Sequence, residues 1–158
     1  MKKIKKYLKN IILYILILLP WLISGLIFKV DNTFYNSLNL PSFTLNGKII
    51  SIIWFIIYNL ITISIILTIK KINIFKNNDY LFILIINYLS NQLFMYFFFY
   101  LMSPFLGFAI TIINYISTIF LFIETQKISK KASYFIIPYI IYGTYALILI
   151  TTIYFMNF

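Results

Sequence analysis

The sequence predicts an all-α integral membrane protein, a five-transmembrane-helix bundle with a long first extracytoplasmic loop. Of its 158 residues, 63% are hydrophobic and 10% are charged, and the mean hydropathy is +0.98. A soluble domain of this length could not bury so much apolar surface. The apolar runs do not alternate with polar residues as the strands of a membrane barrel do. Because lipid offers no partners to backbone groups, the remaining solution is a bundle of helices.

Five apolar segments are long enough to cross a hydrocarbon core of about 30 Å. We expect them at residues 11–28, 49–69, 80–102, 105–123 and 134–156, within one domain over 1–158. The first follows a basic region, as a signal peptide does. However, Pro20-Trp21 interrupts its apolar run and no A-x-A-like cleavage site follows cleanly, which favours a retained helix. Ser103-Pro104 separates the third segment from the fourth, because proline disfavours helical geometry in the residue before it. Pro138 is a candidate kink in the fifth.

The net charge of +10 comes from 13 lysines. They are scattered between apolar segments, so they indicate topology and contacts with lipid headgroups, and no nucleic-acid partner is expected. Eleven of them fall in the N-terminal tail and in the second and fourth connections, whereas Lys29 and Lys48 fall on the other side. The positive-inside rule therefore predicts a cytoplasmic N-terminus and an outward C-terminus.

Several classes of chemistry are excluded by composition. Cysteine and histidine are both absent, which removes disulfides, zinc sites, iron–sulfur clusters and haem held by histidine. The acidic residues are Asp31, Asp79 and Glu124, and they offer neither paired carboxylates for acid–base catalysis nor a metal cage. They also lie near segment ends or in a loop, so an ion pathway through the membrane is poorly supported.

The connection at about 29–48 is long for a small bundle and carries Phe34, Tyr35, Pro41 and Phe43. Loops of this length are often functional. Its aromatic residues suit either a lid over a site or an anchor in the lipid headgroups, and both interpretations stay open.

Three amides, Asn87, Asn91 and Gln92, lie at membrane depth in the third segment. An unpaired amide in hydrocarbon costs several kcal/mol, so these groups must face protein, trapped water or a ligand. Asn87 and Asn91 lie one turn apart on one stripe, and Gln92 begins a neighbouring stripe. They either bind neighbouring helices as structural links or face a site.

Polar or aromatic faces also mark the other segments. They carry Trp54, Tyr58 and Thr62 in the second, Thr111, Asn114, Ser117 and Thr118 in the fourth, and Tyr142 and Tyr145 in the fifth. Trp54 stands apart because tryptophan prefers the membrane interface, whereas this one lies inside a span. Turned inward, these faces form a cavity of rings, amides and hydroxyls, which suits a flat, mostly apolar ligand with polar edges.

At these residues the chain resembles the TspO/MBR family of translocator and tryptophan-rich sensory proteins. Residues 34–44, FYNSLNLPSFT, with Trp54 and Tyr58 beyond them, resemble its W-Y-x-x-L-x-K-P-x-W-x-P-P…W-x-x-L-Y signature. Asn91-Gln92-Leu93 is similar to its Q-L-x-L-N-x-x-W region, and residues 138–146 to its P-Y-x-x-W-x-x-F-A run. The chain departs from the pattern where Phe34, Phe43, Phe99 and Tyr142 replace tryptophans, and where Leu45-Asn46 replaces a proline pair.

The resemblance implies a five-helix bundle, commonly a homodimer, whose first loop caps a pocket for porphyrin-like, sterol-like or isoquinoline-type molecules. Carried over by position, the implied ligand-binding residues are Tyr35, Phe43, Trp54, Asn87, Asn91, Gln92, Tyr142 and Tyr145. No cofactor is required, and protoporphyrin IX is the candidate ligand. Without histidine, a metal-free porphyrin is favoured over ligated haem.

Three functions follow from the resemblance. The first is a membrane binding protein in tetrapyrrole sensing or handling. The second is a light-dependent protoporphyrin-degrading enzyme, which is less expected because a partner tryptophan is replaced by Tyr142; its only candidate catalytic residue is Trp54. The third is a small-molecule transporter or structural membrane subunit.

Overall fold

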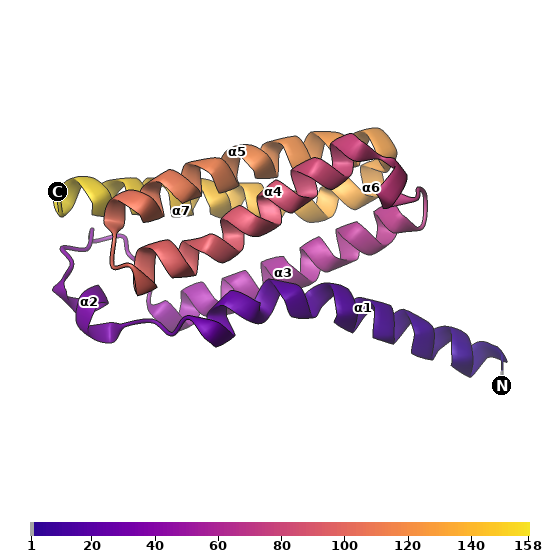
Figure 1. Cartoon of the computed structure of the whole chain (residues 1–158), viewed down its shortest axis with the longest axis horizontal. Helices are drawn as coiled ribbons and strands as arrows, with labels where there is room; N and C mark the ends of the chain where they lie inside the picture. Colours follow the sequence, from indigo (N-terminus) through magenta and orange to yellow (C-terminus); the bar gives the residue numbers. More distant parts are fainter. Residues whose placement is uncertain (1) are drawn as a thin grey trace.

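The computed structural model describes the backbone of residues 2–158 and the side chains from Tyr7 onward. The described residues form helices and no strand (Figure 1). In chain order the elements are α1 (Lys2–Ile27), α2 (Asn32–Ser37), α3 (Gly47–Ile69), the short 3-10 helix η1 (Ile74–Lys76), α4 (Asn78–Phe94), the π-helical segment η2 (Met95–Tyr100), α5 (Pro104–Ile128), α6 (Lys130–Ser133), the 3-10 helix η3 (Tyr134–Ile136) and α7 (Ile137–Met156).

The prediction of a five-helix membrane protein is confirmed. Five helical stretches in the described chain are long and apolar enough to cross a bilayer: Tyr7–Ile27, Gly47–Ile69, Asn78–Tyr100, Pro104–Ile128 and Lys130–Met156. The fourth runs five residues beyond its predicted end at 123. An ion pair between Lys127 and Glu124 (2.5 Å) lies in these added turns, and the helix ends at Ile128. The protein is therefore a multi-pass integral membrane protein.

Two prolines begin helices. After η2, Met102 adopts a left-handed backbone with φ of 50°. The Ser103 hydroxyl then accepts the Leu106 N–H (3.2 Å), and Pro104 is the first residue of α5. This is the predicted break. Pro138 lies in the first turn of α7, directly after η3. A proline at this position replaces an N–H that has no partner within α7.

The bundle encloses its core between two groups of helices. The helix α5 lies between α4 and α7, while α1 lies along α3. α3 meets the fifth span chiefly through α6 and η3, at the end away from the first loop. In Figure 1 the first half of α1 diverges from α3 toward the N-terminus. The side chains of residues 1–6, which include four of the lysines used for the predicted orientation, lie outside the described part.

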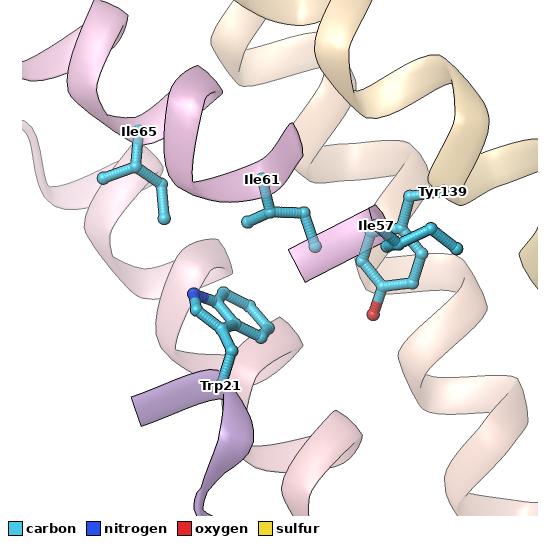
Figure 2. Close-up of a cluster of buried hydrophobic side chains, with 5 residues drawn as sticks. All are labelled: Trp21, Ile57, Ile61, Ile65 and Tyr139. Carbon is cyan, nitrogen blue, oxygen red and sulfur yellow. The ribbon is translucent and has the colours of Figure 1, made fainter. Parts of the chain in front are cut away.

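A cluster of buried side chains holds α1, α3 and α7 together (Figure 2). The Trp21 ring points from α1 toward Ile61 of α3, and Tyr139 approaches from α7. Trp21 is 3% exposed, and Ile61 is fully buried. This cluster fixes the position of α1 at the level of the site.

The first loop packs on the end of the bundle through ring contacts and hydrogen bonds. The Phe34 ring of α2 packs edge-on against Phe98, with ring centroids 5.6 Å apart. The Asn39 N–H donates to the side-chain oxygen of Asn157 (2.8 Å), and the Asn157 amide donates to the Asn39 carbonyl (3.0 Å). The Leu45 N–H donates to the Tyr145 hydroxyl of α7 (3.0 Å). The loop is therefore tied to the last helix at two points.

Replacing Asn157 with alanine is expected to loosen this loop. Both bonds to Asn39 are lost, and a net hydrogen bond contributes about 0.5–1.5 kcal/mol, so amide exchange over residues 38–46 rises by about tenfold. Hydrogen exchange followed by mass spectrometry measures this. Thr152→Ala is the matched control, because that hydroxyl bonds only within α7, to the Ile148 carbonyl. Equal exchange in the two variants would show that the pair of asparagines does not hold the loop.

Candidate ligand-binding cavity

A cavity of about 740 Å³ lies beneath the first loop, between the spans. Side chains from α1, α3, α4 with η2, α5 and α7 form its wall, and Val30, Asn32 and Tyr35 of the first loop line its upper side. Its volume falls within the range of about 300–1,000 Å³ typical of small-molecule sites. Among the residues that the structure describes, no charged side chain lines it.

Aromatic rings form one wall, centred on Trp54. The Trp54 ring lies 5.6 Å from Tyr58, 5.8 Å from Tyr139 and 5.5 Å from Tyr142, measured between centroids. Trp21 stacks on the same Tyr58 at 5.9 Å. Each of these rings is held by several neighbours and is therefore rigid. Binding a flat molecule against this wall should cost little side-chain conformational entropy.

The floor of the cavity is a chain of neutral hydrogen bonds. The Tyr58 hydroxyl donates to the Asn91 side-chain oxygen (2.9 Å), and the Asn91 amide donates to the Tyr139 hydroxyl (3.2 Å). Tyr139 in turn donates to the Asn114 side-chain oxygen (2.9 Å), whose amide donates to Ser90 (3.2 Å). Within the described residues, the Asn91 amide uses one of its two hydrogens on Tyr139. Asn91 lines the cavity, so its side chain can also contact a bound molecule.

The roof also presents an uncharged hydroxyl. Tyr35 belongs to α2, half-buried, with its ring 6.1 Å from that of Phe99. Burial, and to a lesser extent the neighbouring Tyr145, raises the pKa of the Tyr35 phenol above its usual value of 10.0. Tyr35 is therefore neutral at physiological pH.

Five of the eight predicted site residues line the cavity: Tyr35, Trp54, Asn91, Tyr142 and Tyr145. Three do not. Phe43 is 45% exposed and packs on the outside of Tyr145, whose hydroxyl donates to the Phe43 carbonyl (3.2 Å). Gln92 turns toward α1, where its amide bonds to the Ser24 N–H and the Trp21 carbonyl.

The structure does not place Asn87 among the residues that line the cavity. Its amide donates to the hydroxyls of Ser117 (3.0 Å) and Thr118 (2.8 Å), and the side chain is fully buried between α4 and α5. Asn87 lies one turn from Asn91 on the same stripe, at a level where α5 packs directly on α4. The structural-link interpretation therefore describes Asn87 and Gln92.

Other lining residues carried weaker signals in the sequence. Trp21 follows Pro20, and the pair reads as an interruption of an apolar run; its ring nevertheless lines the cavity. Ser90 and Phe98 also line it, on the helix that carries Asn91. Ser90 directly precedes Asn91 in the sequence, and this is the signal that could have identified it. In the structure Ser90 accepts a hydrogen bond from the Asn114 amide, within the network that includes Asn91.

Replacing Asn87 with alanine is expected to lower stability and leave ligand binding intact. An interhelical hydrogen bond in a membrane protein contributes about 0.6 kcal/mol on average, and Asn87 makes several, so the free energy of unfolding should fall by about 1 kcal/mol. Thermal unfolding in detergent measures the loss. The matched variant Asn91→Ala is expected to weaken binding of protoporphyrin IX. A greater loss of affinity from Asn87→Ala than from Asn91→Ala would contradict this placement.

Within the described chain, no group of acidic side chains is placed to hold a metal ion. The cavity supplies rings, amides and hydroxyls, so what it can do is bind and orient a largely apolar molecule. The fold and the site together define a multi-pass membrane protein with an internal cavity of aromatic and neutral polar side chains beneath its first loop.

The chain belongs to the TspO/MBR family, whose pattern it matches over residues 11–156. It is 31% identical to the tryptophan-rich protein TspO of Bacillus cereus over 148 residues, which cover 94% of this chain and 96% of that protein. It is also 35% identical over 134 residues to the uncharacterized membrane protein YtaB of Bacillus subtilis, covering 85% and 86% of the two chains. The predicted family resemblance is confirmed.

Proposed function

We propose that this protein binds porphyrin-like, flat apolar molecules in the cavity beneath its first loop, in tetrapyrrole sensing or handling. The observation that carries the proposal is the pairing of a rigid ring wall with a neutral polar floor. Stacking on Trp54 suits a planar macrocycle. The Asn91 amide suits a polar group at its edge.

The absence of charge in the described lining favours a ligand whose body is uncharged. Burying an ion without a partner is costly, so any carboxylate of the ligand must lie near the first loop, where solvent and headgroups are accessible. Protoporphyrin IX meets this requirement, because both of its propionates are attached along one edge of an otherwise apolar ring system.

The same proposal includes the orientation in the membrane. The described lysines of the second and fourth connections lie at the end of the bundle opposite the first loop. The positive-inside rule then gives a cytoplasmic N-terminus and a cavity that is covered from the outer side.

Titration of the detergent-purified protein with protoporphyrin IX tests the proposal. Both tryptophans line the cavity, so binding is expected to quench tryptophan fluorescence and to shift the Soret band, saturating at one ligand per chain. An unchanged Soret band and unquenched fluorescence at micromolar ligand would overturn it.

A further inference from the structure

A second hollow lies on the outer face of the bundle, between α1 and α4. This groove of about 390 Å³ is open to the surface and is lined mainly by apolar and aromatic side chains, including Ile23, Leu89 and Leu93. In a membrane protein this face meets lipid. Ser24 and Phe28 line both the groove and the cavity. Ser24 and Phe28 therefore lie between the groove and the cavity, while Leu26 of α1 and Phe55 of α3, which are 74% and 53% exposed, line the cavity on its α3 side.

This layer is held by side chains of α4 acting on the backbone of α1. The Ser24 N–H donates to the Gln92 side-chain oxygen (3.0 Å), and the Gln92 amide donates to the Trp21 carbonyl (3.3 Å). The Tyr88 hydroxyl donates to the Pro20 carbonyl (3.2 Å). In a regular helix the Ser24 N–H and the Pro20 carbonyl pair with each other. Here α4 engages both groups.

Pro20 lies inside α1, one residue before the cavity lining begins at Trp21. Proline has no N–H and its ring clashes with the preceding turn, so helices bend at such positions. The residues after Pro20 line the cavity, whereas those before it form the diverging half of α1. Movement about Pro20 would separate α1 from α4 once the bonds from Gln92 and Tyr88 release, and individual hydrogen bonds between membrane helices are weak.

We propose that the boundary between α1 and α4 is a lateral portal, through which a membrane-dissolved planar ligand passes from the outer groove into the cavity. Gln92 and Tyr88 form its latch. This inference rests on the proposed function and adds the route. An alternative route runs past the first loop, which the Asn39–Asn157 pair and the bond from Leu45 to Tyr145 hold to the end of the bundle.

Tethering tests the portal directly, because the chain has no cysteine of its own. Ile23→Cys with Leu89→Cys, joined by a bis-maleimide, ties α1 to α4 across the groove; Asn39→Cys with Asn157→Cys, oxidised to a disulfide, ties the first loop to α7. The transfer rate of protoporphyrin IX from liposomes to reconstituted protein is followed by tryptophan quenching. The first tether is expected to slow association by about tenfold or more with little change in the final level, and the second to leave the rate within about threefold.

A single substitution, compared with a matched control, tests the hydrogen bond between α4 and α1 without a tether. Tyr88 and Tyr96 both line the groove, but only the Tyr88 hydroxyl bonds to α1 in the described structure. Tyr88→Phe is expected to accelerate association by about threefold, and Tyr96→Phe to leave it unchanged. Unaltered rates in the α1–α4 tether, or a slowing confined to the loop tether, would overturn the portal while leaving binding in place. No quenching in the untethered protein would instead overturn the proposed function, and the portal with it.

Discussion

Replacing Trp54 with leucine is expected to weaken protoporphyrin IX binding by about ten- to hundredfold. Trp54 lines the cavity and is fixed by Tyr58, Tyr139 and Tyr142, with centroids 5.5–5.8 Å away. An aromatic pair is worth about 0.5–1.5 kcal/mol beyond its buried area. Leucine also provides less surface to a macrocycle, so the total loss is about 1.5–3 kcal/mol, and each 1.4 kcal/mol is about tenfold in affinity.

The measurement is an equilibrium titration followed at the Soret band. Phe82→Leu is the control, because this ring of α4 is 67% exposed on the outer surface and does not line the cavity. It removes an aromatic ring from the protein at a site that a bound ligand does not touch. Equal affinities for Trp54→Leu and Phe82→Leu would place the ligand somewhere other than against Trp54.

Replacing Gly107 with valine is expected to lower the free energy of unfolding by about 1–3 kcal/mol, the usual cost of overpacking a core. Gly107 lies in the first turns of α5, where α5 meets η2. A Cβ at this position would lie 2.7 Å from Cδ2 of Phe98 and 3.1 Å from its Cβ. Phe98 is 2% exposed and packs against Phe34 and Phe94, so displacing its ring would break these contacts.

Thermal unfolding in detergent measures this effect, with Gly25→Val as the matched control. A Cβ at Gly25 meets no atom within 4 Å, so the control isolates the cost of a branched residue in a helix. The melting temperature should fall further for Gly107→Val. Equal melting temperatures would contradict the close approach of α5 to Phe98.

The fold was predictable because lipid leaves few solutions. Unbroken apolar runs of membrane-spanning length had to be helices, and Ser103-Pro104 marked a helix boundary through a local property of proline. Pro138 illustrates the limit of such reasoning. The effect of this proline depends on whether the residues before it are helical. Those residues form the short turns of α6 and η3, which pack against α3, and the local sequence does not reveal that contact.

The site was predictable in its residue types and less so in its directions. Asn87 and Asn91 share one stripe of α4, yet Asn87 meets hydroxyls of α5 and Asn91 faces the cavity. The difference arises because α4 and α5 pack closely at one level and enclose the cavity at another. Spacing along a single helix contains no information about that separation. Trp21 was missed for a related reason, because its neighbours on α3 and α4 cannot be identified from the sequence of α1 alone.

A structure of the complex with protoporphyrin IX would show directly where the ligand binds. We expect density for one macrocycle in the cavity, against the Trp54 ring, with its pyrrole edge toward Asn91 and its propionates toward the first loop. Density confined to the outer surface, with Trp54, Asn91 and Tyr35 in contact with no ligand, would contradict it.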